Sequence, residues 1–320
     1  MNQGVNMNNN LKTLILSLFM VFLLVGCAKK GAKTSKGTSQ QEETSGVVSV
    51  DGAELHYVIE GKGIPWIGLG HLESQRRILS QELRNHFKFV FMDLRHDARS
   101  NSSLEISKIT LDTYLDDIDK VRRTLGLDVT VIFGHSHHAF MAIEYARKYP
   151  AKISHLIITG CKPRAAWGAG DEFWEKDASD KRKMIFNQNW EKIPGDELDQ
   201  MSPKERQVTT YVAMTPKLLY DTRGDLSYIV NAFDNDRDVF LHLQNSILKD
   251  YDIIKGTPIS TPVFLALGRY DYVSPYILWD DRKDVLPNLS YNLFKKSGHF
   301  PMVEEQELFD KKLIEWIKSH

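Results

Sequence analysis

Short, nearly continuous apolar segments recur along residues 65–295, each six or seven residues long, and they restrict the possible folds most strongly. Runs without a polar face are typical of parallel strands that are buried on both sides. Helical patterns lie between the runs, so the sequence predicts an α/β fold whose mostly parallel sheet is flanked by helices. The predicted strands are PWIGLG (65–70), KFVFMD (88–93), VTVIFG (129–134), SHLIITG (154–160), PVFLALG (262–268) and LSYNLFK (289–295).

The segments around these strands carry clear start and stop signals. Residues 46–61 alternate between apolar and polar around Asp51-Gly52, which predicts a β-hairpin. Apolar residues repeat every three or four positions from 111 to 125, with Thr110 as the expected N-cap and Gly126 as the stop. The chain after 136 is expected to be helical until Tyr149-Pro150, and residues 305–318 form a last amphipathic helix.

Residues 162–255 interrupt this rhythm, because they hold helical stretches and no strand-like run. The segment lies between two predicted strands, which indicates a helical cap inserted into a core made of residues 47–161 and 256–320. Its many aromatic side chains would line a substrate pocket under the cap, or they would simply pack the extra helices. The pocket candidates are Trp167, Phe173, Trp174 and Tyr211.

The N-terminus has the pattern of an export signal. Residues 14–25 are an apolar run preceded by Lys12, which predicts a signal peptide over residues 1–26. The run is too short to cross a bilayer, which needs about 20 residues. Its end, Leu24-Val25-Gly26-Cys27, resembles the lipobox of bacterial lipoproteins. That resemblance implies lipidation of Cys27 and anchoring to a membrane of the cell envelope, at its periplasmic or extracellular face.

Residues 27–46 are polar and predict a flexible tether between this anchor and the folded domain. The alternative is an ordinary signal peptide followed by a cysteine with no special role. Lys and Arg total 41 against 42 Asp and Glu, so no basic excess supports nucleic-acid binding. Cys27 and Cys161 are the two cysteines of the chain, which excludes a disulfide framework and a cysteine-rich zinc site.

Ser136 occupies a position where a serine can act as a nucleophile. Gly134-His135-Ser136-His137 follows a predicted strand and opens a helix. A sharp strand-to-helix turn lifts the hydroxyl out of the sheet, and the amide of His137 then becomes an oxyanion donor. A serine still needs a base and an orienting acid to become reactive.

Asp271 and His299 are the expected partners of Ser136. Each follows the end of another predicted parallel strand, and the carboxyl ends of such strands form a common crevice. Taken singly, the serine could cap a helix, the aspartate could belong to a turn and the histidine could lie on the surface. Together, at three strand ends, they indicate a catalytic triad.

Residues 47–160 and 256–320 resemble the α/β-hydrolase fold. GHSHHAFMAIEYARKYP (134–150), LALGRYDYVSP (265–275) and SGHFPMVEEQELFDKKLIEWI (297–317) are similar to segments of the proline iminopeptidase and haloperoxidase-like branches. The resemblance implies that Ser136 is the nucleophile, that His299 is the general base and then the acid, and that Asp271 orients His299. It also implies a second backbone oxyanion donor in GLGHLES (68–74), at Gly70 or His71, and no cofactor.

Several residues depart from the family pattern. His138, His96 and Ala98 stand where glycine is usual, and an imidazole at 138 requires a small residue opposite it or a shifted helix. The Gly-Gly-Pro-Gly motif of iminopeptidases is also absent. An aminopeptidase activity would require cap carboxylates that hold the substrate amine, for which the candidates are Glu172, Glu175 and Asp177.

The histidines around Ser136 suggest a second interpretation, a metal site. His135, His137 and His138 resemble the start of the metallo-β-lactamase signature, but the Asp-His pair of that signature is missing. Alternate residues of a strand-elbow-helix turn are expected to point in different directions, so the sequence predicts no metal. The prediction is a serine hydrolase that cleaves an ester, amide or lactone of a small molecule or short peptide through an acyl-serine. The alternative is a catalytically silent ligand-binding protein of the same fold.

Overall fold

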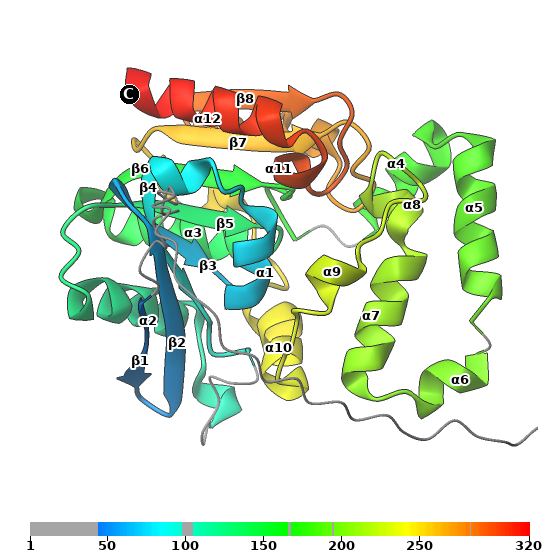
Figure 1. Cartoon of the computed structure of the whole chain (residues 1–320), viewed down its shortest axis with the longest axis horizontal. Helices are drawn as coiled ribbons and strands as arrows, with labels where there is room; N and C mark the ends of the chain where they lie inside the picture. The colour runs from blue at the N-terminus through cyan, green and yellow to red at the C-terminus, as the bar shows by residue number, and fades with distance from the viewer. Residues whose placement is uncertain (1–43, 98–104, 166–167, 194, 282) are drawn as a thin grey trace, which may run out of the picture. The chain divides into compact units, whose positions relative to one another are not determined.

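The computed structural model describes residues 44–97, 105–165, 168–193, 195–281 and 283–320 (Figure 1). The predicted signal peptide, Cys27 and most of the predicted tether lie outside these residues, as do Ala98 and Trp167. Within the described ranges, no helix has the length and apolar composition needed to span a bilayer.

The centre of the protein is an eight-stranded sheet with the strand order β1-β2-β4-β3-β5-β6-β7-β8. β1 and β2 form an antiparallel hairpin, and β2 also pairs with β4 in the antiparallel sense. All other neighbouring strands pair in parallel (Figure 1). The strands are β1 (Thr44–Val50), β2 (Ala53–Gly61), β3 (Ile64–Leu69), β4 (Phe87–Met92), β5 (Thr130–His135), β6 (Ile153–Thr159), β7 (Val263–Gly268) and β8 (Leu289–Phe294).

The predicted fold class is confirmed. The six apolar runs correspond to β3–β8, and their predicted ends differ from the observed ends by no more than one residue. β1 differs more, because it begins at Thr44 rather than after the predicted tether at 46. Gly46 pairs with Tyr57 across the hairpin, and a side chain at 46 would overlap the Tyr57 ring. The lack of a side chain at Gly46 is therefore explained by strand packing rather than by a flexible tether, and Thr44–Gly46 are part of the sheet.

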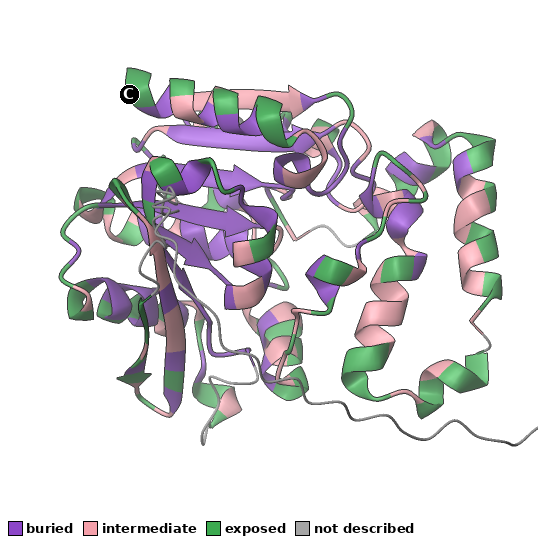
Figure 2. Cartoon of the chain, viewed as in Figure 1, coloured by how far each residue is buried: buried purple, intermediate pink, exposed green. Residues whose placement is uncertain are grey.

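Helices cover both faces of the sheet, and side chains alternate between two apolar cores. Ile132 of β5 faces the core shared with α2 (Leu111–Thr124) and α3 (His138–Lys148). Phe133, the next residue, faces the core shared with α1 (Leu72–Ile78) and α12 (Gln306–Ser319). Figure 2 shows the central strands buried throughout and the outer helix surfaces exposed. Burial on both faces explains why these strands lack a polar side.

The predicted helix boundaries near the site are confirmed. Thr110 and Thr113 form a capping box at the start of α2. Gly126 has a φ of 65°, the left-handed conformation that stops a helix. α3 ends at Lys148, ahead of Pro150. At the C-terminus the predicted helix is preceded by a separate turn, α11 (Pro301–Glu304).

Helices, and no strand of the sheet, occupy the described residues between β6 and β7 that correspond to the predicted insertion at 162–255. Figure 1 shows α4 and α8 beyond the arrowheads of β7 and β8, at the carboxyl ends of the strands. We call this segment the cap. Its helices are α4 (Ala169–Asp177), α5 (Asp180–Glu191), α6 (Gly195–Gln200), α7 (Pro203–Ala213), α8 (Thr215–Leu218), α9 (Ser227–Val230) and α10 (Arg237–His242), with a π-helix at Leu243–Ile247.

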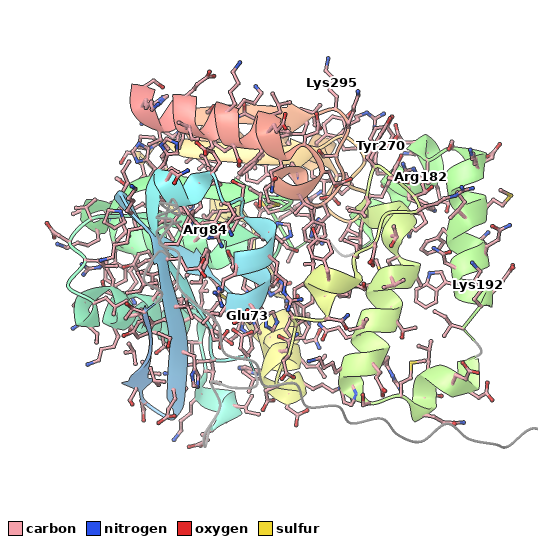
Figure 3. All side chains as sticks on the ribbon, viewed as in Figure 1. Glu73, Arg84, Arg182, Lys192, Tyr270 and Lys295 are labelled. Carbon is pink, nitrogen blue, oxygen red and sulfur yellow. The ribbon has the colours of Figure 1, made fainter. Side chains whose placement is uncertain are left out.

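A buried arginine holds the cap together. Arg182 of α5 is 7% exposed and donates hydrogen bonds to the carbonyl oxygens of Pro216 and Leu219, each at 2.7 Å. Its guanidinium also lies 5.1 Å from the ring centre of Tyr270, beyond the end of β7 (Figure 3). A guanidinium satisfies several carbonyls at once and still stacks on an aromatic ring. Arg182 thus links α5 to α8 and to the residue that follows it.

Candidate active site

Ser136 lies in a sharp turn between β5 and α3. It has a φ of 56° and is the only non-glycine residue with positive φ among those that the structure describes. Its amide donates to the carbonyl oxygen of Thr159 at 2.9 Å. A Cβ at Gly134 would lie 2.6 Å from the Cα of Ala139, so strand and helix backbones are nearly in contact. This strained turn is the one that the sequence predicted for a nucleophilic serine.

Asp271 and His299 form a buried pair. The Nδ1 atom of His299 lies 2.8 Å from Oδ2 of Asp271, and both side chains are at most 5% exposed. The other carboxylate oxygen, Oδ1, accepts the amides of Val273 at 2.9 Å and Ser274 at 2.7 Å. These bonds fix the carboxylate and leave it as an acceptor for the histidine. The proton of His299 therefore resides on Nδ1, and Nε2 is free to act as a base.

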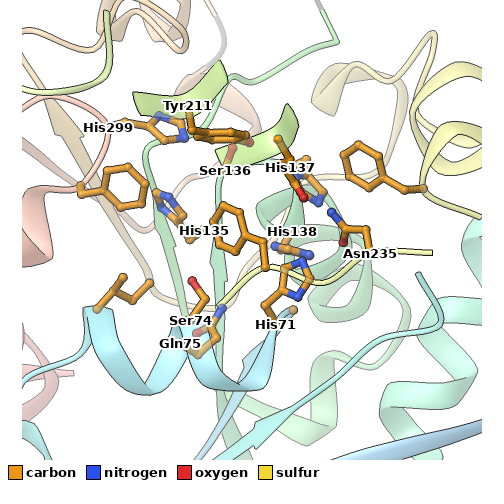
Figure 4. Close-up of a pocket in the computed structure, with 16 residues that line it drawn as sticks. His71, Ser74, Gln75, His135, Ser136, His137, His138, Tyr211, Asn235 and His299 are labelled. Carbon is orange, nitrogen blue, oxygen red and sulfur yellow. The ribbon is translucent and has the colours of Figure 1, made fainter. Parts of the chain in front are cut away.

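A small cavity at the carboxyl ends of the strands connects Ser136 with His299 (Figure 4). Its volume is only about 50 Å³ because imidazole and aromatic side chains fill most of the space. Its walls come from five parts of the chain: the turn between β5 and α3 that holds Ser136, which we call the elbow, the loop after β3, α1, the loop after β8 that holds His299, and the cap. The lining residues are Gly70, His71, Ser74, Gln75, Ile78, His135, Ser136, His137, His138, Gln207, Tyr211, Phe233, Asn235, Phe240, His299 and Phe300.

The backbone amides of His137 and His71 are available at this cavity. Both residues line it, and neither amide donates a hydrogen bond to another described residue. The amide of Leu72, in contrast, donates to Oδ1 of Asp93 at 2.9 Å. In the segment after β3, Gly70 and His71 line the cavity, whereas the backbone amide of Leu72 already has a hydrogen-bond acceptor.

This combination of sheet order, elbow and buried Asp-His pair matches a known family. A sequence profile described as the alpha/beta hydrolase fold matches residues 68–306. The chain belongs to this family. As a member, it is a hydrolase of the α/β-hydrolase superfamily.

Relatives of this α/β hydrolase are found in sequence and in structure. The AB hydrolase superfamily protein YclE of Bacillus subtilis is 32% identical over 280 residues, which span 86% of this chain and 99% of that protein. A proline iminopeptidase of Clostridioides difficile is 27% identical over 227 residues, or 65% of this chain and 73% of that protein. An α/β-fold hydrolase from Bacillus anthracis has a similar structure, with a TM-score of 0.65 and 17% identity over 86% of this chain and 99% of that one. The N-acyl homoserine lactonase AidH is also similar in fold, with a TM-score of 0.61 and 17% identity over 87% of this chain and 97% of that one.

His138 is accommodated by a small residue opposite it, one of the two solutions that the sequence required. The imidazole packs against the Cα of Gly70, and a Cβ at Gly70 would overlap its ring. Gly70 also has a φ of 90°, a conformation that side chains rarely adopt. In this α/β hydrolase, a glycine in the loop after β3 thus makes room for the histidine that replaces the usual glycine of α3.

Gly70→Ala is expected to lower the free energy of unfolding by about 2–4 kcal/mol, because the substitution adds both backbone strain and a steric overlap. His138→Gly removes the overlap but leaves the strain, so the double variant should recover part of the loss. Urea unfolding of the wild type, both single variants and the double variant measures this coupling. If Gly70→Ala lowered the free energy of unfolding equally with and without His138, the packing argument would be contradicted.

The histidines of the elbow fall into two groups. The ring of His135 lies 4.7 Å from that of His299, and its Nδ1 atom lies 3.0 Å from Oγ1 of Thr159. The rings of His137 and His138 are instead only 3.9 Å apart. The expectation that alternate residues diverge is correct for His135 and wrong for His137 and His138. The reason is that α3 begins at His138, and the elbow brings His137 over the first turn of that helix.

Burial controls the charge of these histidines. Loss of hydration, reinforced by the neighbouring imidazoles, holds the pKa of His135, His137 and His138 well below the usual range. Burial also lowers the pKa of His96 to about 4. All four rings are therefore neutral at neutral pH.

His71 behaves differently because it has a carboxylate partner. Its Nδ1 atom lies 2.8 Å from Oδ1 of the buried Asp97. Burial opposes protonation of His71, but Asp97 outweighs it and raises the pKa of the imidazole. Asn235 and Phe233 complete this part of the wall from the cap, and neither is among the pocket residues predicted from the sequence. They follow α9 in an irregular segment without periodicity, so no sequence pattern singles them out.

The structure places the predicted pocket aromatics in two different regions. Tyr211 lines the cavity. Phe173 and Trp174 do not, because both pack against Tyr272, after β7, in a separate cluster between the cap and the core. The assignment of these two residues to the pocket is therefore corrected.

The cap carboxylates do not reach the cavity either. Glu172 forms an ion pair with Lys176, and Glu175 forms one with Lys183. Asp177 is bound by Arg269 at 2.7 and 2.9 Å and by the Tyr272 hydroxyl at 3.1 Å. Among the described residues that line the cavity, none carries a carboxylate.

Glu304 links the cap to the loop of His299 through hydrogen bonds. Its carboxylate oxygens accept the amide of Tyr220 in the cap at 2.6 Å and that of Gly298 at 2.8 Å. Burial raises the pKa of Glu304 to about 7, although these backbone hydrogen bonds act in the opposite direction. The carboxylate is therefore costly to ionise in the folded protein.

This shift predicts a stability that depends on pH. The pKa of Glu304 is about 4.5 in the unfolded chain and about 7 in the folded protein. Between these two pH values the folded state binds more protons than the unfolded state, so the free energy of unfolding falls as pH rises. We expect wild type to lose about 2–3 kcal/mol relative to Glu304→Gln between pH 4.5 and 7.5. Urea unfolding of both proteins across this interval measures the difference. Parallel pH profiles for the two proteins would show that Glu304 does not titrate in this range.

Proposed function

We propose that this α/β hydrolase is a serine hydrolase that cleaves an ester, amide or lactone through a covalent acyl-serine. The observation that carries the proposal is the strained Ser136 turn, which shares one small cavity with a buried His299–Asp271 pair. A silent binding protein of this fold has no physical need for a strained serine beside an oriented imidazole. The site residues proposed to act are Ser136, His299 and Asp271, with the amides of His137 and of Gly70 or His71.

The reaction follows from these positions. Oγ of Ser136 attacks the substrate carbonyl carbon while Nε2 of His299 takes the hydroxyl proton. The negative charge on the carbonyl oxygen is stabilised by the amide of His137 and an amide of the loop after β3. His299 then gives the proton to the leaving oxygen or nitrogen, which leaves an acyl-serine. Water, activated by the same imidazole, releases the acid and restores Ser136.

The walls of the cavity favour an uncharged substrate. A free amine would need a carboxylate partner, and the described lining residues are imidazoles, amides, hydroxyls and apolar or aromatic side chains. A small ester or lactone needs no such partner. We therefore place esters and lactones ahead of aminopeptidase substrates, and a panel of short acyl esters, lactones and proline anilides ranks them by kcat/KM.

We further propose that the protein is exported and anchored to a membrane of the cell envelope through lipidated Cys27. This rests on the apolar run at 14–25, the lipobox-like sequence and the polar tether. A lipid anchor would bring the hydrolase into the detergent phase of a detergent-partitioning experiment, whereas Cys27→Ser should appear in the aqueous phase. Wild type in the aqueous phase, when expressed in a host with lipoprotein processing, would rule out the anchor.

The proposed reaction is tested by the intact mass of the protein after exposure to a fluorophosphonate probe. We expect a single adduct on the wild type and none on Ser136→Ala. Such probes react only with a serine activated by a base and a working oxyanion site. No adduct on a folded wild type would reject the hydrolase mechanism and favour ligand binding.

A further inference from the structure

Three histidines lie together next to the elbow. His96 follows β4, whereas His137 and His138 belong to the turn into α3. One ring nitrogen of each lies within 4.8 Å of those of the other two, and Nε2 of His96 is 3.0 Å from Nε2 of His138. Within the described parts of the chain, no other group of three or more histidine, cysteine or acidic side chains is close enough to hold a metal ion.

The hydrogen bonding of these rings is incomplete. Nδ1 of His96 and Nε2 of His137 are buried and have no hydrogen-bond partner among the described residues. A neutral imidazole has one donor and one acceptor nitrogen, so the contact between His96 and His138 uses only one lone pair. Buried polar atoms without partners are rare, because they lose water and gain nothing in return. An ion that accepts the lone pair of His137 Nε2 would satisfy that atom.

The distances suit a tetrahedral ion. Zinc binds histidine nitrogen at about 2.0–2.1 Å, which places two nitrogen ligands about 3.4 Å apart. The 3.0 Å pair is already close to that spacing, and the third nitrogen has to approach by at most about 1.4 Å. His137 is the least buried of the three residues, so its side chain has the most room to supply this displacement by rotation.

We propose that His96, His137 and His138 bind one divalent transition-metal ion of the kind that prefers imidazole ligands, such as Zn²⁺. Three protein ligands leave a fourth position for an oxygen. Because His137 and His138 line the cavity of Ser136, that position opens toward it. The ion would bind water there, or an oxygen atom of a molecule that enters the cavity.

The surroundings complement a cation. Asp97 follows His96 directly, is 2% exposed and carries its carboxylate beside His71. A buried carboxylate near the ligands offsets part of the charge of the ion. The alternative is a chain of hydrogen-bonded imidazoles without metal, which is an outcome of the test.

The test measures metal binding by the full-length protein, independently of hydrolysis. After treatment with a chelator and reloading with ZnCl₂, we expect one zinc per chain to remain after gel filtration. Co²⁺ should give the intense visible absorption of a tetrahedral site. His96→Asn, which removes a ligand outside the cavity, should weaken zinc binding by about 100-fold or more, while fluorophosphonate labelling persists.

Three variants keep the test decisive. His155→Asn replaces a buried histidine that packs on Trp316, and it should bind zinc as the wild type does. His138→Gly removes a second ligand if His96→Asn does not fold, as judged by thermal unfolding. Ser136→Ala should bind zinc normally, so failure of the serine mechanism and failure of the metal site are distinguishable. No retained zinc on wild type, or equal affinity in folded His96→Asn, would overturn the proposal and leave an imidazole hydrogen-bond network.

Discussion

Ser136→Ala is expected to lower kcat/KM for a short acyl ester by about 10⁴- to 10⁶-fold. The hydroxyl is the only group lost, because alanine at this position keeps the turn between β5 and α3 and meets the same φ of 56°. The residual rate would come from substrate binding and from the backbone amides at His137 and near Gly70. Initial rates with a chromogenic ester measure the loss.

Ser74 offers a matched control for this variant. It also carries a hydroxyl at the cavity wall, but it belongs to α1 and takes no part in the proposed reaction. Ser74→Ala should keep kcat within a few-fold of the wild type, with any change confined to KM. Comparable losses in the two variants would mean that the assay reports cavity shape rather than nucleophilic attack.

Asp271→Asn is expected to lower kcat by about 10⁴-fold with little change in the fold. The carboxylate accepts the Nδ1 proton of His299 at 2.8 Å and the amides of Val273 and Ser274 at its other oxygen. An asparagine can keep the backbone amides on its carbonyl oxygen, but its NH₂ group then faces His299. The imidazole must turn or carry its proton on Nε2, where it can no longer accept the proton of Ser136.

Two measurements separate this tautomer effect from a general disturbance. The kcat of Asp271→Asn should fall much more than its KM rises, since the group acts through His299. Asp177→Asn is the control, because it alters another hydrogen-bonded aspartate, at the cap. The hydrogen bonds of Asp177 are to Arg269 and Tyr272, so this variant should keep kcat near the wild-type value. Wild-type activity in folded Asp271→Asn would remove this residue from the mechanism.

The sheet could be predicted from sequence because burial on both faces leaves a local signature. A strand such as β5 or β7 must be apolar at every position, and the run ends where the strand leaves the core. The positions of Ser136, Asp271 and His299 follow from the same signature, since each lies within five residues of the end of such a strand. The structure brings Asp271 and His299 together as that reasoning expected.

The cavity wall could not be predicted in the same way. Phe173, Trp174 and Tyr211 are all aromatic residues of cap helices, and the first two are as strongly buried as core residues. Which of them faces the cavity depends on how α4 and α7 are rotated and placed, and that is decided by contacts between distant segments. The ring pair of His137 and His138 was missed for a related reason, because the turn reverses the alternation of a strand within two residues.

The carbonyl oxygen of Leu218, at the end of α8, accepts the amide of His299 at 2.6 Å. Lys217 similarly accepts the amide of Tyr272, one residue after Asp271. The backbone of the cap thus helps to position His299, the proposed base, so the cap cannot be exchanged independently of that residue. Anyone who transplants a cap from another hydrolase to change selectivity should leave residues 215–220 in place and join the foreign helices outside them. A graft that replaces this stretch would shift the imidazole along with the substrate pocket, and altered selectivity could not be told apart from a damaged base.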